Sequence, residues 1–146
     1  MISRVIKYIQ ILSGKNIDTI LLYPIAEQKE SIELLEKQKI PYLILTKVHQ
    51  FPQALQVYGN YEKATYIATK HLIKYGHRKI GLLLHENRHS NDCKEGYMQA
   101  LFESDILFES GNVFIGQDEQ ETGRIGAHQF INRNLSAVVC ENEIIA

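Results

Sequence analysis

The sequence predicts an α/β protein in which parallel sheets are flanked by helices. Segments whose apolar residues recur three and four positions apart alternate along the chain with short, solid apolar runs. Glycine or proline stands at several of the junctions between them. Since a helix follows nearly every strand, we expect the strands to pair in parallel through right-handed crossovers.

The first part of the chain contains two expected helices. Gly14 ends the first one, and the apolar run that follows is typical of a strand covered on both faces until Pro24 stops it. In the second helix Glu33 stands four residues before Lys37, a favourable spacing for an ion pair. The expected elements are a helix over 2–12, a strand over 17–23, a helix over 27–39, a strand over 40–46 and a short strand over 56–58.

The rest of the chain repeats the pattern three times. Gly76 ends its first helix, and Gly123 and Gly126 lie on its last helix, where small residues favour close packing. The expected elements are a helix from about 64 to 75, a strand over 79–85, a helix over 92–103, a strand over 113–115, a helix over 122–132 and a strand over 137–141.

Composition excludes several classes of protein. The 146 residues are 45% hydrophobic and 23% charged, which is typical of a globular domain. Lys and Arg number 16 against 17 Asp and Glu, so this chain lacks the basic stripe that grips DNA. Its apolar runs are far shorter than the roughly 20 residues of a membrane span, and its first residues do not form a secretory signal. Two cysteines without a CxxC spacing suit a reducing cytoplasm.

Ligands of parallel α/β sheets bind beyond the carboxyl ends of the strands, where loops and helix N-termini converge. No GxGxxG or Walker glycine loop is present, which excludes dinucleotide and nucleoside triphosphate sites of those kinds. The candidate loops follow Tyr23, Thr46, Tyr58, His85, Gly116 and Glu141.

One segment carries a more specific signal. Ala68, His71-Leu72-Ile73 and Gly76-His77-Arg78-Lys79-Ile80-Gly81 resemble a signature of the LacI/GalR family of bacterial repressors. Other blocks follow in the family's order and cover nearly the whole chain. They are Ile17-Asp18-Thr19-Ile20-Leu21, Ile40-Pro41 with Leu43-Ile44-Leu45, Gly96-Tyr97 with Ala100-Leu101, and Val138 to Glu143 with Ala146.

The resemblance implies a two-lobed effector domain, like the periplasmic sugar-binding proteins, that closes around a small molecule and dimerises. Residues 1–58 would be the latter half of the N-terminal lobe, and residues 59–146 the first part of the C-terminal lobe. The chain is therefore expected to be a partial copy of that domain. The helix-turn-helix with which family members read an operator is absent from this chain.

Family ligand positions carry over only in part. Asn142 matches an asparagine that hydrogen-bonds a ligand hydroxyl in sugar-responsive members, although it could equally cap a helix beginning there. Cys93 stands where the family usually has an arginine, Thr46 where it has an aspartate, and Asp118 where an aromatic ring is common. These departures predict a remodelled pocket.

Other groups could hold the ligand instead. His89, Asp92 and Asp118 are candidates, although a solvated loop residue is the simpler interpretation of each. Tyr23, at the end of a strand, is a candidate wall for a sugar face. With Asn142, Cys93 and Thr46, these residues form the predicted ligand site.

Metal and catalytic interpretations are weaker. His85, His89, Asp92 and Cys93 fall within nine residues, but their irregular spacing is unlike that of structural zinc sites. Cys93 with His89 as a base could make a nucleophilic enzyme or a redox switch, yet no third orienting residue or oxyanion motif is recognisable. We therefore expect no catalytic residue, no metal and no cofactor.

The function predicted from the sequence is that of a cytoplasmic LacI/GalR-type regulator's effector domain. It would bind a small carbohydrate-like effector between two lobes, favour one dimer arrangement by population shift, and reach operator DNA only through an N-terminal domain outside this chain. A homodimer without membrane contact is expected. An exported sugar-binding protein of the same fold is the alternative.

Overall fold

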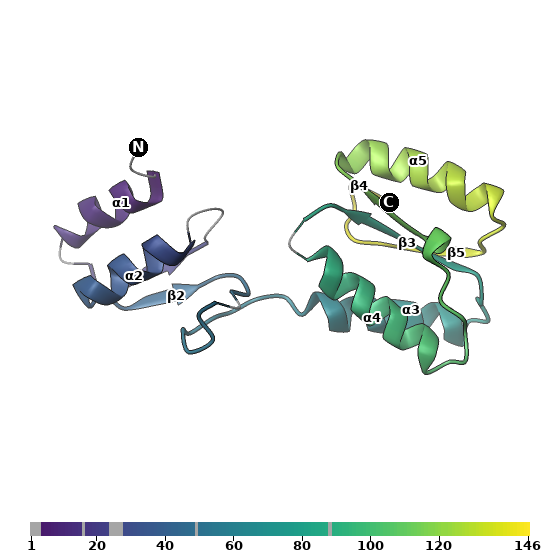
Figure 1. The fold of residues 1–146 in the computed structure, drawn as a ribbon, viewed down its shortest axis with the longest axis horizontal. Coiled ribbons are helices and arrows are strands. Elements are labelled where there is room, and N and C mark those ends of the chain that lie inside the picture. Colours follow the sequence, from purple (N-terminus) through teal and green to yellow (C-terminus); the bar gives the residue numbers. More distant parts are fainter. Residues whose placement is uncertain (1–3, 16, 24–27, 49, 88) are drawn as a thin grey trace. The chain divides into compact units, whose positions relative to one another are not determined.

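The computed structural model describes residues 4–15, 17–23, 28–48, 50–87 and 89–146, which form two compact units over residues 1–59 and 60–146 (Figure 1). Each unit is an α/β layer with parallel strands, as the sequence predicts. No helix in the described part of the chain has the length and apolar character needed to cross a membrane.

The unit of residues 1–59 has a small parallel sheet with helices on one face. Its elements are α1 (Arg4–Ser13), β1 (Ile20–Leu22), α2 (Gln28–Gln38) and β2 (Tyr42–Ile44). Ile20 pairs with Tyr42 and Leu22 with Ile44, and a single bridge joins Ile44 to Gln56. The Gln56 amide bonds to the backbone of Val48 and Phe51 and so fixes the loop after β2.

Alternation along β1 separates a buried face from an exposed one. Ile20 and Leu22 pack with Ile9 of α1 and with Ile32 and Leu35 of α2. Leu21, between them, is 63% exposed on the opposite face. Side chains of a strand alternate between the two faces, so the helices cover only one of them here. The expectation of a strand covered on both faces is therefore wrong for β1 within this chain.

The unit of residues 60–146 has a three-stranded parallel sheet in the order β4-β3-β5. Leu82 pairs with Val113, and Leu83 pairs with Cys140. Its elements are α3 (Tyr61–Lys74), β3 (Ile80–His85), α4 (Ser90–Phe102), a 3-10 turn (Ser110–Asn112), β4 (Val113–Gly116), α5 (Glu119–Asn132) and β5 (Ala137–Cys140).

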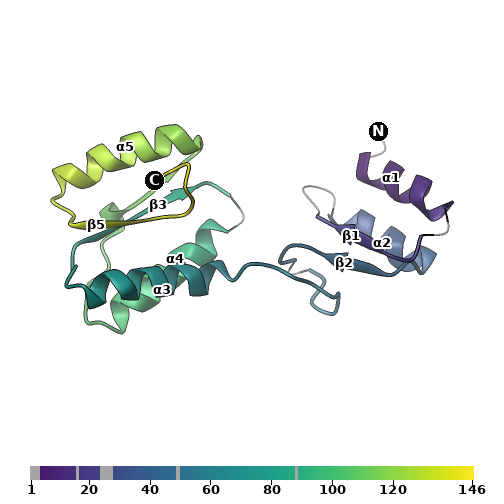
Figure 2. The same ribbon diagram turned by 180° about the vertical axis from the view of Figure 1, so that it is seen from behind.

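Helices cover both faces of this sheet, with α5 on one face and α3 and α4 on the other (Figures 1 and 2). The central strand β3 is buried from Ile80 to Leu84, which explains its solid apolar run. The buried Tyr97 of α4 donates its hydroxyl proton to the Ile80 carbonyl over 2.8 Å. Gly126 lets α5 approach Leu83, which confirms the packing role predicted for it.

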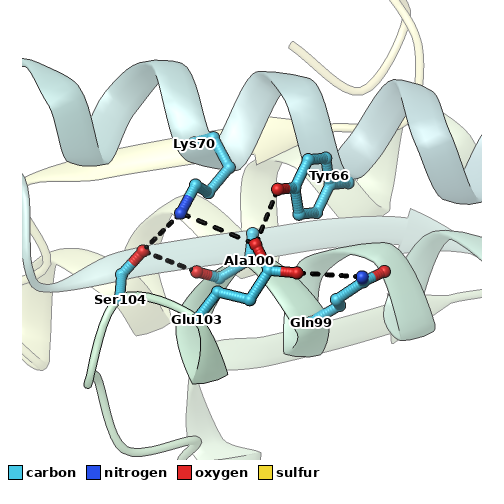
Figure 3. A network of polar contacts seen from close by, with 6 residues as sticks. All are labelled: Tyr66, Lys70, Gln99, Ala100, Glu103 and Ser104. Atoms are coloured by element: carbon cyan, nitrogen blue, oxygen red, sulfur yellow. Dashed lines mark hydrogen bonds and ion pairs between the residues drawn. The ribbon is translucent and has the colours of Figure 1, made fainter.

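The helices α3 and α4 pack closely along one another. A Cβ at Gly96 would lie 2.0 Å from the Glu62 carbonyl oxygen, so only glycine fits at this crossing. A network of polar contacts joins α3 to the C-terminal end of α4, as Figure 3 shows. There the Tyr66 hydroxyl donates to Glu103 over 2.6 Å, and Lys70 donates to Ser104 over 3.0 Å.

The observed bounds differ from the predicted ones mainly at element ends. The strands β1 and β2 are each three residues long, because pairing between them covers only that register. The helix α5 begins at Glu119, three residues earlier than predicted, because Asp118 caps it. Gly76 follows α3 with φ +93°, which confirms its role as a helix stop. The predicted starts of the first helix at residue 2 and of the second helix at residue 27 lie outside the described residues.

Candidate functional site

The carboxyl ends of β4, β3 and β5 lie at one edge of the sheet, because all three strands are parallel. Backbone bonding continues past the strand ends, where Glu86 N–H donates to Gly116 O over 2.7 Å. His85 Nε2 lies 2.8 Å from the Gln117 carbonyl oxygen. A carbonyl only accepts hydrogen bonds, so Nε2 carries the proton and Nδ1 is the nitrogen left for other partners.

The Glu141 carboxylate links β5 to the loop that follows β3. One of its oxygens accepts the His85 backbone N–H over 2.8 Å, and the other accepts the side-chain amide of Asn87. The side-chain oxygen of Asn87, Oδ1, in turn accepts the His89 backbone N–H over 2.7 Å. Ser90 Oγ closes the loop, because it accepts the Asn87 backbone N–H and lies 2.7 Å from the His85 carbonyl as a donor.

An aromatic pair stands beside this loop. The rings of His89 and Tyr61 are stacked, with their centroids 4.0 Å apart and an interplanar angle of 16°. Tyr61 is the first residue of α3, directly after the Asn60 cap, whose side chain accepts the Lys63 backbone N–H over 2.8 Å. Two helix N-termini, those of α3 and α4, are thereby tied together by ring stacking.

Cys93, in the first turn of α4, is only 2% exposed. Burial raises the pKa of its thiol, a hydrogen bond with Thr65 lowers it, and the nearby carboxylates of Glu141 and Asp92 raise it further. The net shift is upward, so the neutral thiol is favoured at physiological pH. Burial also raises the pKa of Cys140, at the end of β5. Neither shift produces the thiolate that a nucleophilic enzyme or redox switch would use.

Two predicted ligand residues have local structural partners. Asp118 caps α5, since its carboxylate accepts the Glu121 backbone N–H over 2.9 Å. Asn142 accepts the backbone N–H groups of Ile144 and Ile145, each over 3.0 Å, and donates to Glu119 over 2.8 Å. Asn142 is thus a capping residue, but of a turn, because residues 141–146 form no helix. The ligand roles of both residues stay predictions.

The remaining predicted residues are divided between the two units. Asp92 is half-buried in the first turn of α4, next to Cys93. In the unit of residues 1–59, Thr46 is 3% exposed just after β2, and Tyr23 is 55% exposed just after β1. Each lies at the carboxyl end of its own strand, where the sequence predicts it.

The sequence does not predict the hydrogen bonds of Glu141 and Asn87 that organise this edge, nor the stacking of the Tyr61 ring on His89. The available signal was position, because Glu141 directly follows a strand at the ligand-binding edge. For the metal interpretation, the residues that the structure describes contain no group of three or more His, Cys, Asp or Glu that could hold an ion.

Comparison with known proteins places the chain in a family. The family described as periplasmic binding proteins and sugar binding domain of LacI family matches residues 3–146. An HTH-type transcriptional repressor PurR of Vibrio atlanticus is 34% identical over 146 residues, covering 95% of this chain and 43% of the repressor. The chain therefore spans less than half the length of this relative.

Solved structures agree on the fold. A LacI-family regulatory protein from Chloroflexus aggregans superposes with a TM-score of 0.83 at 23% identity, over 97% of this chain and 53% of the other. A complex of the regulator CelR with cellobiose superposes with a TM-score of 0.76 at 20% identity, over 95% of this chain and 44% of the other. The parallel α/β layers, the family match and these relatives lead to one conclusion: the chain belongs to the family of periplasmic binding proteins and LacI-type sugar-binding domains.

Proposed function

We propose that the chain is the ligand-sensing part of a LacI/GalR-type transcriptional regulator. The family match over residues 3–146 carries this proposal. Repressors among the curated relatives favour a regulator over an exported binding protein, although the family description covers both. Residues 1–58 and 59–146 would then be parts of the N-terminal and C-terminal lobes, in a cytoplasmic homodimer.

The proposed ligand is a small carbohydrate-like effector. The candidate ligand residues are Asn142, Cys93, Asp118, His89 and Asp92 in the unit of residues 60–146, and Thr46 and Tyr23 in the unit of residues 1–59. The stacked rings of Tyr61 and His89 support this chemistry, because aromatic faces with polar edges suit sugar rings. The CelR structure is a complex with cellobiose, so a related fold holds a carbohydrate, which is consistent with a carbohydrate here.

The output would be a shift between conformations rather than a reaction. A ligand changes such an equilibrium only by its difference in affinity for the two states. A tenfold change in operator affinity needs about 1.4 kcal/mol of coupling, which one or two closure-dependent hydrogen bonds supply. Operator binding would belong to a segment outside residues 1–146.

A thermal-shift screen tests the proposal. The protein is heated with sugars, sugar phosphates, polyols and purines. A ligand that binds only the folded state raises Tm, because at a concentration of 100 times Kd it adds about 2.7 kcal/mol to the free energy of unfolding. The Asp92→Asn variant, changed in the first turn of α4, should reduce the shift in Tm. Lys74→Gln, an exposed change at the C-terminal end of α3, should retain it. Absence of a shift across the whole panel would contradict the proposed function.

A further inference from the structure

The Glu141 carboxylate bonds to the end of β3 and to the loop that follows it. It bonds to the backbone of His85, where β3 ends, and to the side chain of Asn87, and it makes these bonds from the end of the neighbouring strand β5. Carboxylates accept and never donate, so both N–H groups must face this residue for the arrangement to exist. The loop after β3 is thereby fixed to an element 54 residues further along the chain.

The orientation of the Asn87 amide carries the effect further. Because its NH2 group faces Glu141, its carbonyl oxygen faces the other way and accepts the His89 backbone N–H. His89 is thereby held where its ring stacks on Tyr61. A continuous chain of contacts therefore runs from β5 through the loop to the first residue of α3.

We propose that Glu141 is a positioning residue, which sets the Asn87 amide and through it holds His89 and the N-terminus of α4 ready for the ligand. The inference rests on the proposed function for its effect on ligand binding, but its geometry does not. Loop groups that lose these bonds remain near solvent, where water can replace the partners, so the loss should loosen the loop rather than unfold the unit. A loop ordered before binding gives higher affinity, because less entropy is lost when the ligand binds.

Exchanging the amide and the carboxylate gives a sharp test. In Glu141→Gln, a single oxygen remains for two donors. If it accepts the His85 N–H, the new NH2 group faces the NH2 group of Asn87, and turning the Asn87 amide would place its NH2 against the His89 N–H; if it accepts the Asn87 NH2 group, the new NH2 group faces the His85 N–H instead. In Asn87→Asp, two carboxylates face each other. In the double variant, the amide at position 141 keeps its oxygen for the His85 N–H and donates its NH2 to the carboxylate at position 87, whose second oxygen accepts the His89 N–H. The double variant should therefore restore the arrangement that each single variant breaks.

Two readouts separate this inference from the proposed function. Amide hydrogen exchange of His89, followed by NMR, needs no ligand and should accelerate by at least about tenfold in each single variant and return toward the wild-type rate in the double variant. The affinity for the panel compound that raises Tm most should follow the same order. Glu143→Gln, an exposed change two residues further on, is the matched control and should alter neither.

Wild-type exchange at His89 in both single variants would overturn the proposal, as would a double variant no closer to wild type than the single ones. Faster exchange with unchanged affinity for that compound would overturn the positioning role while leaving the proposed function intact. Exchange that follows the expected order in a protein that binds no panel compound would instead contradict the proposed function, and the role in ligand binding with it.

Discussion

Replacing Gly96 by alanine should destabilise the unit of residues 60–146, although alanine is the better helix former. In an open helix the change would add about 1 kcal/mol of stability. Here the new Cβ would lie 2.0 Å from the Glu62 carbonyl oxygen and 3.0 Å from the Tyr66 backbone nitrogen. Since Cβ contacts below 3.0 Å are essentially never found, α3 and α4 must separate by about 1 Å.

The cost of that separation exceeds the gain in helix propensity. A radial gap of about 0.5–1 Å already forfeits a quarter to a half of each dispersion contact, and overpacking costs about 1–3 kcal/mol or more. After the gain of about 1 kcal/mol in helix propensity, we expect a net loss of up to about 2 kcal/mol, which lowers Tm by up to roughly 8–16 °C for a domain of this size. Urea unfolding followed by circular dichroism measures it. Gly14→Ala, which meets only an ordinary contact at 3.6 Å, is the control. A Gly96→Ala variant as stable as the wild type would show that α3 and α4 accommodate a side chain at this crossing.

Three further predictions concern single side chains. Burial raises the pKa of Tyr97 from 10.0 to about 12, so the folded state keeps the hydroxyl proton to a higher pH than the unfolded state does. The free energy of unfolding should therefore fall as pH rises from 10 toward 12. Tyr97→Phe should remove this pH dependence, as measured by urea unfolding at each pH. Asp118→Ala removes the cap of α5 and should cost about 0.5–2 kcal/mol in the same assay, and a loss no larger than that of the exposed Glu143→Ala would count against the cap. Cys93, buried with a raised pKa, should react with a disulfide reagent only after denaturant is added; rapid labelling of the folded protein would contradict its assigned burial.

Much of the fold could be predicted because its signals are local. The continuous apolar run of β3 indicates a strand that is buried on both faces. Gly76 after α3 indicates a helix end that needs a positive φ. The sequence pattern predicts a start of α5 at residue 122, whereas the helix begins at Glu119, after the cap formed by the Asp118 carboxylate. A short polar side chain before a helix serves either purpose, and sequence alone does not separate them.

The candidate site was predictable as an edge but not as a set of contacts. Parallel strands bring their carboxyl ends together, so His89, Asp92 and Asn142 could be expected in the neighbouring loops. The bonds from Glu141 to His85 and Asn87 join residues 54 to 56 positions apart, and no periodicity or local spacing encodes such a pair.

The alternation of helices and strands and the family can be predicted from the residues alone, because helix stops, apolar periods and ordered motifs lie within short stretches of chain. Which polar groups hydrogen-bond to one another follows only from the folded arrangement. Hydrogen-bond partners depend on distances of a few tenths of an ångström between distant segments, and those distances are set by how the layers pack. For that reason the position of Asn142 could be predicted, whereas its partner Glu119 and the loop contacts of Glu141 emerged only in three dimensions.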